Sequence, residues 1–511
     1  MKHVIITLTL LPFFAMAQNV GIGTDIPAGK LHIKGTEDTT QLLIEANSIQ
    51  SNNHPLLLFT KGTIPILSLH SDAASNVFLG LSSGKSNVPG SGANNTLIGS
   101  GAGRSNTTGS SNTALGYGTI FNNATGYSLI AIGVNALTSN TSGFSNIAIG
   151  GNALGANRTK SGSIAIGINA LANTDNSLTG GTTRNIALGT NALKGSLSPT
   201  NNIGTSNIAI GENALFSFSG GGNNTAVGVN SLYYNSGGQY NSGMGVQTLY
   251  NNTTGIYNSA MGINALYNNI GNSYNTGIGY NALFSTTASD YNTALGSQAG
   301  DSYNNGFNNV FLGANADVNG AGYYNVIAIG QGTVVGGVST ARFGNAATAS
   351  YGGWAGWTNV SDGRFKSNVQ ENVPGLAFIS KLRPVTYNLD ATRLDAFLHK
   401  NDSPEKLAIA AKNSSHLQAL QEKEQIIYTG FIAQEVEKSA KELGFDFSGV
   451  DKARNENDTY GLRYAEFVVP LVKAVQELDA ENSLLKKQLD TIGKQYEELK
   501  RMVVSLSEGK K

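Results

Sequence analysis

Residues 361–369 combine residue types that could carry out nucleophilic chemistry. The stretch reads Ser-Asp-Gly-Arg-Phe-Lys-Ser-Asn-Val, which places Ser361 five residues before Lys366. A serine hydroxyl becomes a good nucleophile only when a base removes its proton, and a lysine can be that base only while its amine is neutral. Burial lowers the pKa of a lysine whereas an arginine stays charged, so Lys366 is a better candidate base than Arg364. Taken alone, the same stretch would be a β-turn with an exposed lysine.

Two halves of different composition meet here. Residues 361–511 carry 22 of the 33 lysines and arginines and 23 of the 33 acidic residues, but 8 of the 64 glycines. We expect a linker over 346–360. The formal net charge of zero gives no long-range attraction to nucleic acid or anionic lipid. Because the chain has no cysteine and six scattered histidines, we expect no disulfide, no metal site, no cofactor and no nucleic-acid partner.

The first seventeen residues have the pattern of a signal peptide. A cationic start at residues 1–3 precedes an apolar run over 4–14 and the small-x-small sequence Ala15-Met16-Ala17, which is typical of a cleavage site. A membrane anchor is the alternative, but the run is shorter than the ~20 residues that span a bilayer. We therefore expect a mature chain that begins at Gln18, is secreted or displayed on the cell surface, and has no membrane span.

Short alternating apolar runs between glycines and a proline indicate an N-terminal β segment over 18–75. A repeat then occupies residues 76–345. Its unit reads Asn-x-Ala-(Leu/Ile/Val)-Gly-x-Asn-Ala-Leu followed by a polar tract, with repeat glycines seventeen residues apart except for two steps of twenty-two. Units of fixed length stack because none can bury its apolar face alone. The repeat glycines are Gly99, Gly116, Gly133, Gly150, Gly167, Gly189, Gly211, Gly228, Gly245, Gly262, Gly279, Gly296, Gly313 and Gly330.

We expect one short strand per coil, and hence a parallel β-solenoid or β-roll. Leucines four residues after each glycine would form an apolar column, asparagines such as Asn213 and Asn264 a ladder of amides, and the glycines corners with positive φ or close backbone approach. Extra residues in the two longer coils would bulge out as loops. A disordered low-complexity tract is the alternative, although disorder gives no reason for a constant period. The unit resembles the head repeats of trimeric bacterial surface adhesins, whose step is shorter, and this resemblance implies three chains side by side.

Tyrosines cluster in the second half of the repeat. A ring with a polar edge suits the face of a sugar, so Tyr233, Tyr240, Tyr257 and Tyr274 are candidate contacts to a surface glycan or another cell-surface ligand. Packing between coils is the alternative, because several of these tyrosines recur at repeat-locked positions. Acidic residues of the repeat, Asp301 and Asp317 among them, occur singly, so no paired-carboxylate glycosidase site is predicted.

Three further motifs follow the serine stretch in a fixed order. They are Leu382-Arg383-Pro384-Val385-Thr386-Tyr387, Gly430-Phe431-Ile432-Ala433-Gln434-Glu435-Val436 and Tyr460-Gly461-Leu462-Arg463-Tyr464. Together with Ser-Asp-x-Arg-x-Lys-x-Asn, this set resembles the intramolecular chaperone domain of phage tailspikes and fibres, peptidase family S74. We place an α+β core of this type at 361–466 and the whole region at about 361–489.

The resemblance implies that this domain assists trimerisation of the fibre before it and then releases itself by cutting the bond before the motif serine, here Val360–Ser361. In relatives with a Ser/Lys dyad the lysine five residues on is the base, which maps to Lys366. Attack by Ser361 on the preceding carbonyl would give an ester that water hydrolyses. An oxyanion donor is also required, and Asn368 is a candidate. His399 and His416 lie in a helical insertion at 390–427, where we expect solvated surface histidines. The alternative is a catalytic role, because a histidine contributes to self-cleavage in some relatives.

The chain ends in a predicted coiled coil over 467–507, with unbroken heptads and a polar, register-setting Asn482. Valine at a with leucine at d favours two strands, whereas the family resemblance implies three, which would let fibre, chaperone and coil share one axis. Positions a are Val468, Val475, Asn482, Leu489, Tyr496 and Val503, and positions d are Leu471, Leu478, Leu485, Ile492, Leu499 and Leu506.

These features predict an exported homotrimeric fibre or adhesin-like surface protein with a self-cleaving chaperone domain. Self-cleavage, which occurs once per chain, is the only catalytic activity that the sequence predicts. Two alternatives remain open: a tailspike-like fibre that degrades glycan, and a passive spacer with a chaperone domain that does not cleave.

Overall fold

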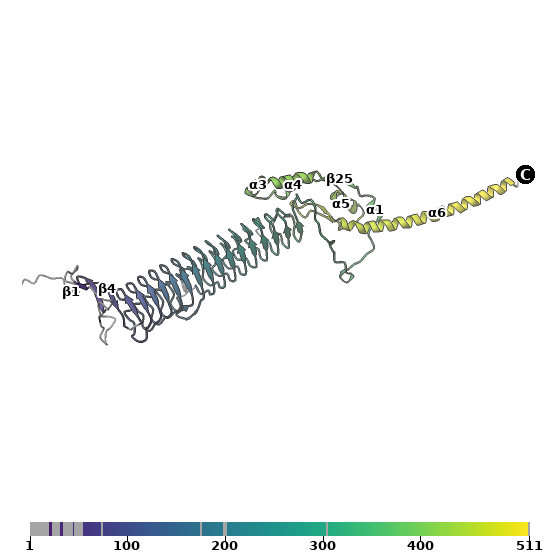
Figure 1. The fold of residues 1–511 in the computed structure, drawn as a ribbon. Coiled ribbons are helices and arrows are strands. Elements are labelled where there is room, and N and C mark those ends of the chain that lie inside the picture. The colour runs from purple at the N-terminus through teal and green to yellow at the C-terminus, as the bar shows by residue number, and fades with distance from the viewer. Residues whose placement is uncertain are drawn as a thin grey trace, which may run out of the picture.

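The computed structural model describes residues 55–508 except 73–74, 174–175, 198–201 and 303–304, together with the backbone at 20–22 and 31–33 and Ile44. A long rod of stacked coils carries a small α+β region beside its C-terminal end, and a single long helix projects beyond it (Figure 1). The predicted signal peptide lies outside the described residues. The predicted order of solenoid, α+β region and long helix is confirmed.

Short strands precede the rod. β1 (Val20–Ile22) pairs in parallel with β2 (Leu31–Ile33), while β3 (Leu57–Lys61) and β4 (Ile64–His70) form an antiparallel hairpin. β4 then pairs with β5 (Val77–Leu79), which is the first strand of the rod.

The rod is a parallel β-solenoid in which each coil contributes one three-residue strand to a continuous sheet. Equivalent residues pair in register from coil to coil, as Ala131 pairs with Ala148 and Ala165 with Ala187. The strands after β5 are β6 (Thr96–Ile98), β7 (Thr113–Leu115), β8 (Ile130–Ile132), β9 (Ile147–Ile149), β11 (Ile164–Ile166), β13 (Ile186–Leu188), β14 (Ile208–Ile210), β15 (Thr225–Val227), β16 (Ser242–Met244), β17 (Ser259–Met261), β18 (Thr276–Ile278), β19 (Thr293–Leu295), β20 (Val310–Leu312), β22 (Ile327–Ile329) and β24 (Ala341–Phe343).

The repeat places small and apolar residues where the coil has no room for others. From β5 to β22 the middle residue of each three-residue strand is buried and is usually alanine, and the leucine four residues after the repeat glycine is buried, as at Leu154 and Leu171. Gly228 has φ +134°, and a Cβ there would lie 2.3 Å from the carbonyl oxygen of Gly245 in the next coil. Only glycine tolerates both conditions, so the expectation for the repeat glycines is confirmed.

Three asparagine ladders run along the described part of the rod, one of which joins Asn123 Nδ2 to Asn106 Oδ1 at 2.7 Å. In the predicted one, Asn213 Nδ2 donates to Asn230 Oδ1 at 3.2 Å and Asn264 Nδ2 to Asn281 Oδ1 at 3.1 Å. The second ladder lies just before each strand and is fully buried. In it Asn207 Oδ1 accepts the backbone N–H of Asn224 at 2.9 Å. Because a buried amide needs partners, this ladder fixes the register between coils.

The two longer coils do not disturb the stack. Ile164 still pairs with Ile186, and Ile186 with Ile208. Extra residues of the first longer coil form β12 (Gly181–Thr182), which pairs with β10 (Lys160–Ser161) of the preceding coil. Near the end of the rod β21 (Asp317–Val318) pairs in the same way with β23 (Val334–Val335).

The α+β region surrounds a small aromatic core that includes Phe378, Phe447 and Phe467. β25 pairs antiparallel with β26, and β27 with β28. Its elements are the 3-10 turn η2 (Gly363–Phe365), α1 (Leu376–Ile379), β25 (Val385–Asn388), α2 (Ala391–Leu398), α3 (Pro404–Ala410), α4 (Ser414–Glu424), β26 (Ile427–Gly430), α5 (Ala433–Glu442), β27 (Val450–Asp451), β28 (Gly461–Leu462) and the 3-10 turn η3 (Tyr464–Phe467).

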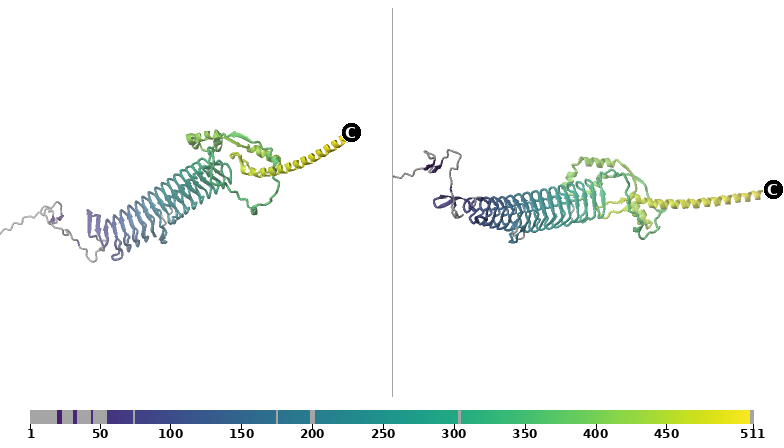
Figure 2. Two further views of the ribbon diagram at one scale, coloured as in Figure 1. Left: turned by 45° about the vertical axis from the view of Figure 1, so that its right-hand side comes forward. Right: turned by 60° about the horizontal axis from the view of Figure 1, so that its bottom comes forward.

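The last element, α6 (Val468–Glu508), is one continuous helix. Its start packs against α1, where Glu477 accepts the backbone N–H of Leu376 at 2.7 Å, and the rest projects away from the molecule in both views of Figure 2. Its predicted d-position residues Leu485 and Ile492 are exposed. The helix is therefore observed, whereas its pairing with other copies remains a prediction.

Candidate functional site

The structure brings Ser361 and Lys366 together. Lys366 Nζ donates a hydrogen bond to Ser361 Oγ at 2.8 Å. The turn that allows this is η2, whose N-terminus is capped by Asp362, the acceptor for the backbone N–H of Arg364 at 2.9 Å. Ser-Asp-Gly-Arg is thus both the turn that its composition indicates and the device that folds Lys366 back onto the serine.

The other charged residues of the stretch are engaged with each other. Arg364 forms an ion pair with Asp362 at 2.6 Å, and this hydrogen bonding lowers the pKa of Asp362. Asn368 is exposed with φ 55°, and no hydrogen bond between Asn368 and Ser361 is present in the described structure. Of the cationic residues in the stretch, Lys366 is therefore the one that contacts the serine.

Ser361 and Lys366 are both exposed in a single chain. The residues before them are equally open, with Trp357 91% and Val360 90% exposed. The burial that a neutral lysine requires is therefore not supplied by one copy of the chain.

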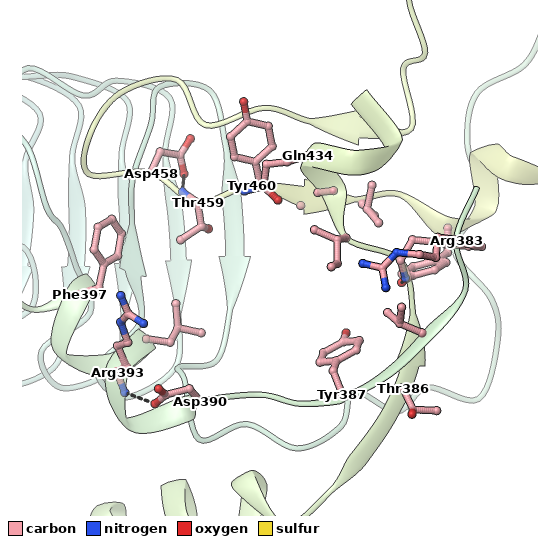
Figure 3. Close-up of a pocket in the computed structure, with 18 residues that line it drawn as sticks. Arg383, Thr386, Tyr387, Asp390, Arg393, Phe397, Gln434, Asp458, Thr459 and Tyr460 are labelled. Carbon is pink, nitrogen blue, oxygen red and sulfur yellow. Dashed lines mark hydrogen bonds between the residues drawn. The ribbon is translucent and has the colours of Figure 1, made fainter. Parts of the chain in front are cut away.

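The other three motifs converge on a cleft of about 850 Å³ (Figure 3). Arg383 and Tyr387 come from the first motif, Gln434 from the second and Tyr464 from the third. Arg383 is held by a bidentate ion pair with Glu435 at 2.6 and 3.0 Å, and the Tyr464 hydroxyl accepts the backbone N–H of Phe431 at 3.2 Å. Neither Ser361 nor Lys366 lines this cleft.

Residues 361–445 match the peptidase S74 family, described as the chaperone of endosialidase. This segment is therefore similar to the chaperone domains of that family. The predicted resemblance is confirmed for these residues, which include the serine stretch and the first two of the further motifs. No curated protein and no solved structure matches the chain.

The candidate tyrosines ahead of the chaperone domain fall into two columns. Tyr233 belongs to a half-buried column in which rings of successive coils stack 4.9–5.2 Å apart: Phe216, Tyr233, Tyr250, Tyr267 and Phe284. Tyr240, Tyr257 and Tyr274 form an exposed column with Tyr291, with centroids 4.8–5.2 Å apart. Stacking covers both ring faces of Tyr257 and Tyr274, so their edges and hydroxyls are what solvent reaches.

The histidines of the chaperone insertion differ from the solvated residues expected. His399 Nδ1 lies 2.9 Å from Asp402 and His416 Nε2 lies 3.1 Å from Asp395, with both rings largely buried. Burial lowers the pKa of His399, but hydrogen bonding and attraction to Asp402 outweigh it, so the net pKa is raised. Both histidines are therefore partly buried side chains that contact aspartates of the same insertion, and not solvated surface residues.

One charged cluster was missed by sequence reasoning. Asp301 and Asp317 do not act singly, because both contact Lys406 of the chaperone domain. Their separation of sixteen residues, close to one coil, was the available signal. Within the described part of the chain no group of three or more side chains could hold a metal ion, and no helix is long and apolar enough to cross a membrane.

Proposed function

We propose that this chain is an exported, homotrimeric, fibre-like surface protein whose chaperone domain assists assembly and then cuts the Val360–Ser361 bond. The observation that carries the proposal is the 2.8 Å hydrogen bond from Lys366 to Ser361 at the first residues of a peptidase S74 domain. The open linker before it leaves the bond accessible to attack.

The cleavage proceeds in two steps. Ser361 Oγ attacks the Val360 carbonyl carbon as its proton passes to Lys366 Nζ, the Val360–Ser361 C–N bond breaks, and the freed amine of Ser361 takes up a proton. Water then hydrolyses the ester between Val360 and the Ser361 oxygen, giving a carboxylate and restoring the hydroxyl. Because one serine cuts its own chain once, there is no turnover.

Self-association is supported by an aliphatic column on the outer face of the sheet. The third residue of every three-residue strand from β6 to β22 is Ile, Leu, Val or Met and stands half-exposed or exposed, for example Leu115, Met244 and Met261 at 43–48%. With strands about 4.8 Å apart, the column is about 60 Å long. Continuous apolar surface of this extent marks an interaction site, and other copies of the same rod match its length and period.

Assembly and cleavage are coupled by burial. Lys366 is exposed in one chain, so the dyad can be buried only where neighbouring copies cover it. Cleavage would then follow trimer formation, which is the order a chaperone requires.

The exposed tyrosine column would contact a surface glycan through ring edges and phenol hydroxyls, since stacking occupies the faces of its inner rings. Binding of a glycan array that falls in a Tyr257→Ala variant, but not in Tyr351→Ala in the linker, would support this role. Unchanged binding by both variants would contradict it.

The exposed dyad also favours one alternative, a spacer whose chaperone domain does not cleave. A glycan-degrading activity gains no such support, because Asp301 and Asp317 are buried beneath Lys406.

Denaturing electrophoresis of the purified full chain separates these possibilities. We expect two fragments from wild type, a single full-length band from Ser361→Ala, and wild-type fragments from the matched control Ser367→Ala, with the same trimeric mass for all three before denaturation. A wild-type trimer whose chains stay uncut would contradict self-cleavage and favour the alternative, a spacer whose chaperone domain does not cleave.

A further inference from the structure

The chaperone domain is docked on the last coils of the rod through a buried lysine. Lys406 of α3 is 8% exposed and contacts Asp301 and Asp317, which are 11% and 4% exposed. Lys406 Nζ also donates to Ser302 Oγ at 2.9 Å and lies 3.2 Å from Asp317. Figure 1 shows α3 alongside the C-terminal coils.

This cluster depends on two coils at once. Asp301 follows the repeat glycine Gly296, whereas Asp317 follows Gly313 in the next coil. A buried cation is costly unless its partners are present and well placed. Lys406 therefore fits only where these two coils have stacked in register.

A second set of contacts covers the end of the rod. Asn455 Nδ2 donates to Tyr323 Oη at 3.0 Å and to the Gly336 carbonyl at 2.9 Å. Arg342 of the last strand forms an ion pair with the largely buried Asp458 at 3.0 Å. The contacts come from parts of the chaperone domain that are about fifty residues apart from Lys406, so the docking is not a single local contact.

We propose that this interface holds the cut chaperone domain on the end of the fibre, so that breaking the Val360–Ser361 bond does not by itself release it. The inference rests on the proposed self-cleavage for its biological setting. Its partner is the folded pair of terminal coils, which Lys406 recognises through Asp301 and Asp317, two side chains that only correct stacking brings together.

The test cuts the linker independently of Ser361. A specific protease site placed at Gly352–Gly356, where added side chains meet nothing within 4 Å at Gly352 and Gly356, is introduced into the full chain carrying Ser361→Ala. After digestion we expect both fragments to co-elute on size exclusion. Lys406→Met should weaken fragment association at least tenfold, while the exposed control Lys412→Met should not.

Should Lys406→Met fail to fold, Asp458→Asn provides a second variant, which weakens the ion pair with Arg342 at the end of the rod. Fragments that separate in the parent protein, or that stay together equally well in Lys406→Met and Asp458→Asn, would overturn the proposal. Because digestion replaces self-cleavage, a wild-type chain that never cuts itself would refute the proposed function without affecting this result.

Discussion

If Lys366 is the base for Ser361, the side chain at position 366 must be able to become neutral. Lys366→Arg keeps a cation next to Ser361 but cannot become neutral, so we expect cleavage to slow by about 100-fold or more, in line with loss of a general base. The fraction of cut chain over time measures this. Lys381→Arg, in the same domain, serves as control, and wild-type cleavage by Lys366→Arg would show that Lys366 is not the base.

The sequence paired Ser361 with Lys366 through the family resemblance, and the short turn between the two residues explains why they meet. The sequence could not predict the exposure of these two residues, which depends on what packs over the turn. Nor could it separate Tyr233 from Tyr240, since the two belong to different columns only once the coil has a shape.

At the level of the coil, the repeat glycines should be indispensable. Gly228→Ala introduces a side chain at φ +134° and 2.3 Å from the next coil, and strain of that kind costs about 1–3 kcal/mol before the clash is counted. Hydrogen exchange should show faster opening of the coils around Gly228. Gly220→Ala, where a Cβ meets nothing within 4 Å, is the matched control, and equal exchange in both variants would contradict the assignment.

The strength of docking through Lys406, Asp301 and Asp317 should depend on pH. Burial and, next, repulsion from Asp317 raise the pKa of Asp301 to about 7 from 3.8, despite attraction to Lys406. The docked state therefore holds a proton that the free state lacks between about pH 4 and 7, so docking is strongest at low pH and weakens as pH rises through 7, by at most roughly tenfold per unit.

Fragment affinity measured at pH 5.5 and 7.5 checks this dependence. Asp402 and His399 also lie close enough to act on Lys406, and the pKa of His399 is itself raised. Asp301→Asn, which mimics the protonated acid, separates the two sources. The Asp301→Asn fragments should bind each other tightly at both pH values. A pH dependence of fragment affinity that persists in Asp301→Asn would show that Asp301 is not its source.

Across the whole molecule, the fixed period was enough to predict the solenoid, because a constant step of apolar residues has few other structural explanations. The heptads likewise predicted the helix now seen as α6. The docking of Lys406 on Asp301 and Asp317 could not be predicted, since it joins residues about a hundred positions apart with no shared pattern. The buried asparagine ladder was visible as a repeated residue, but its burial was not.

Intact mass with N-terminal sequencing of the product recovered from expressing cells tests the central claim most directly. We expect a trimer of two fragments per copy, one beginning at Gln18 and ending at Val360, the other beginning at Ser361. A single chain that runs uninterrupted through residues 360–361 in a correctly assembled trimer would contradict it.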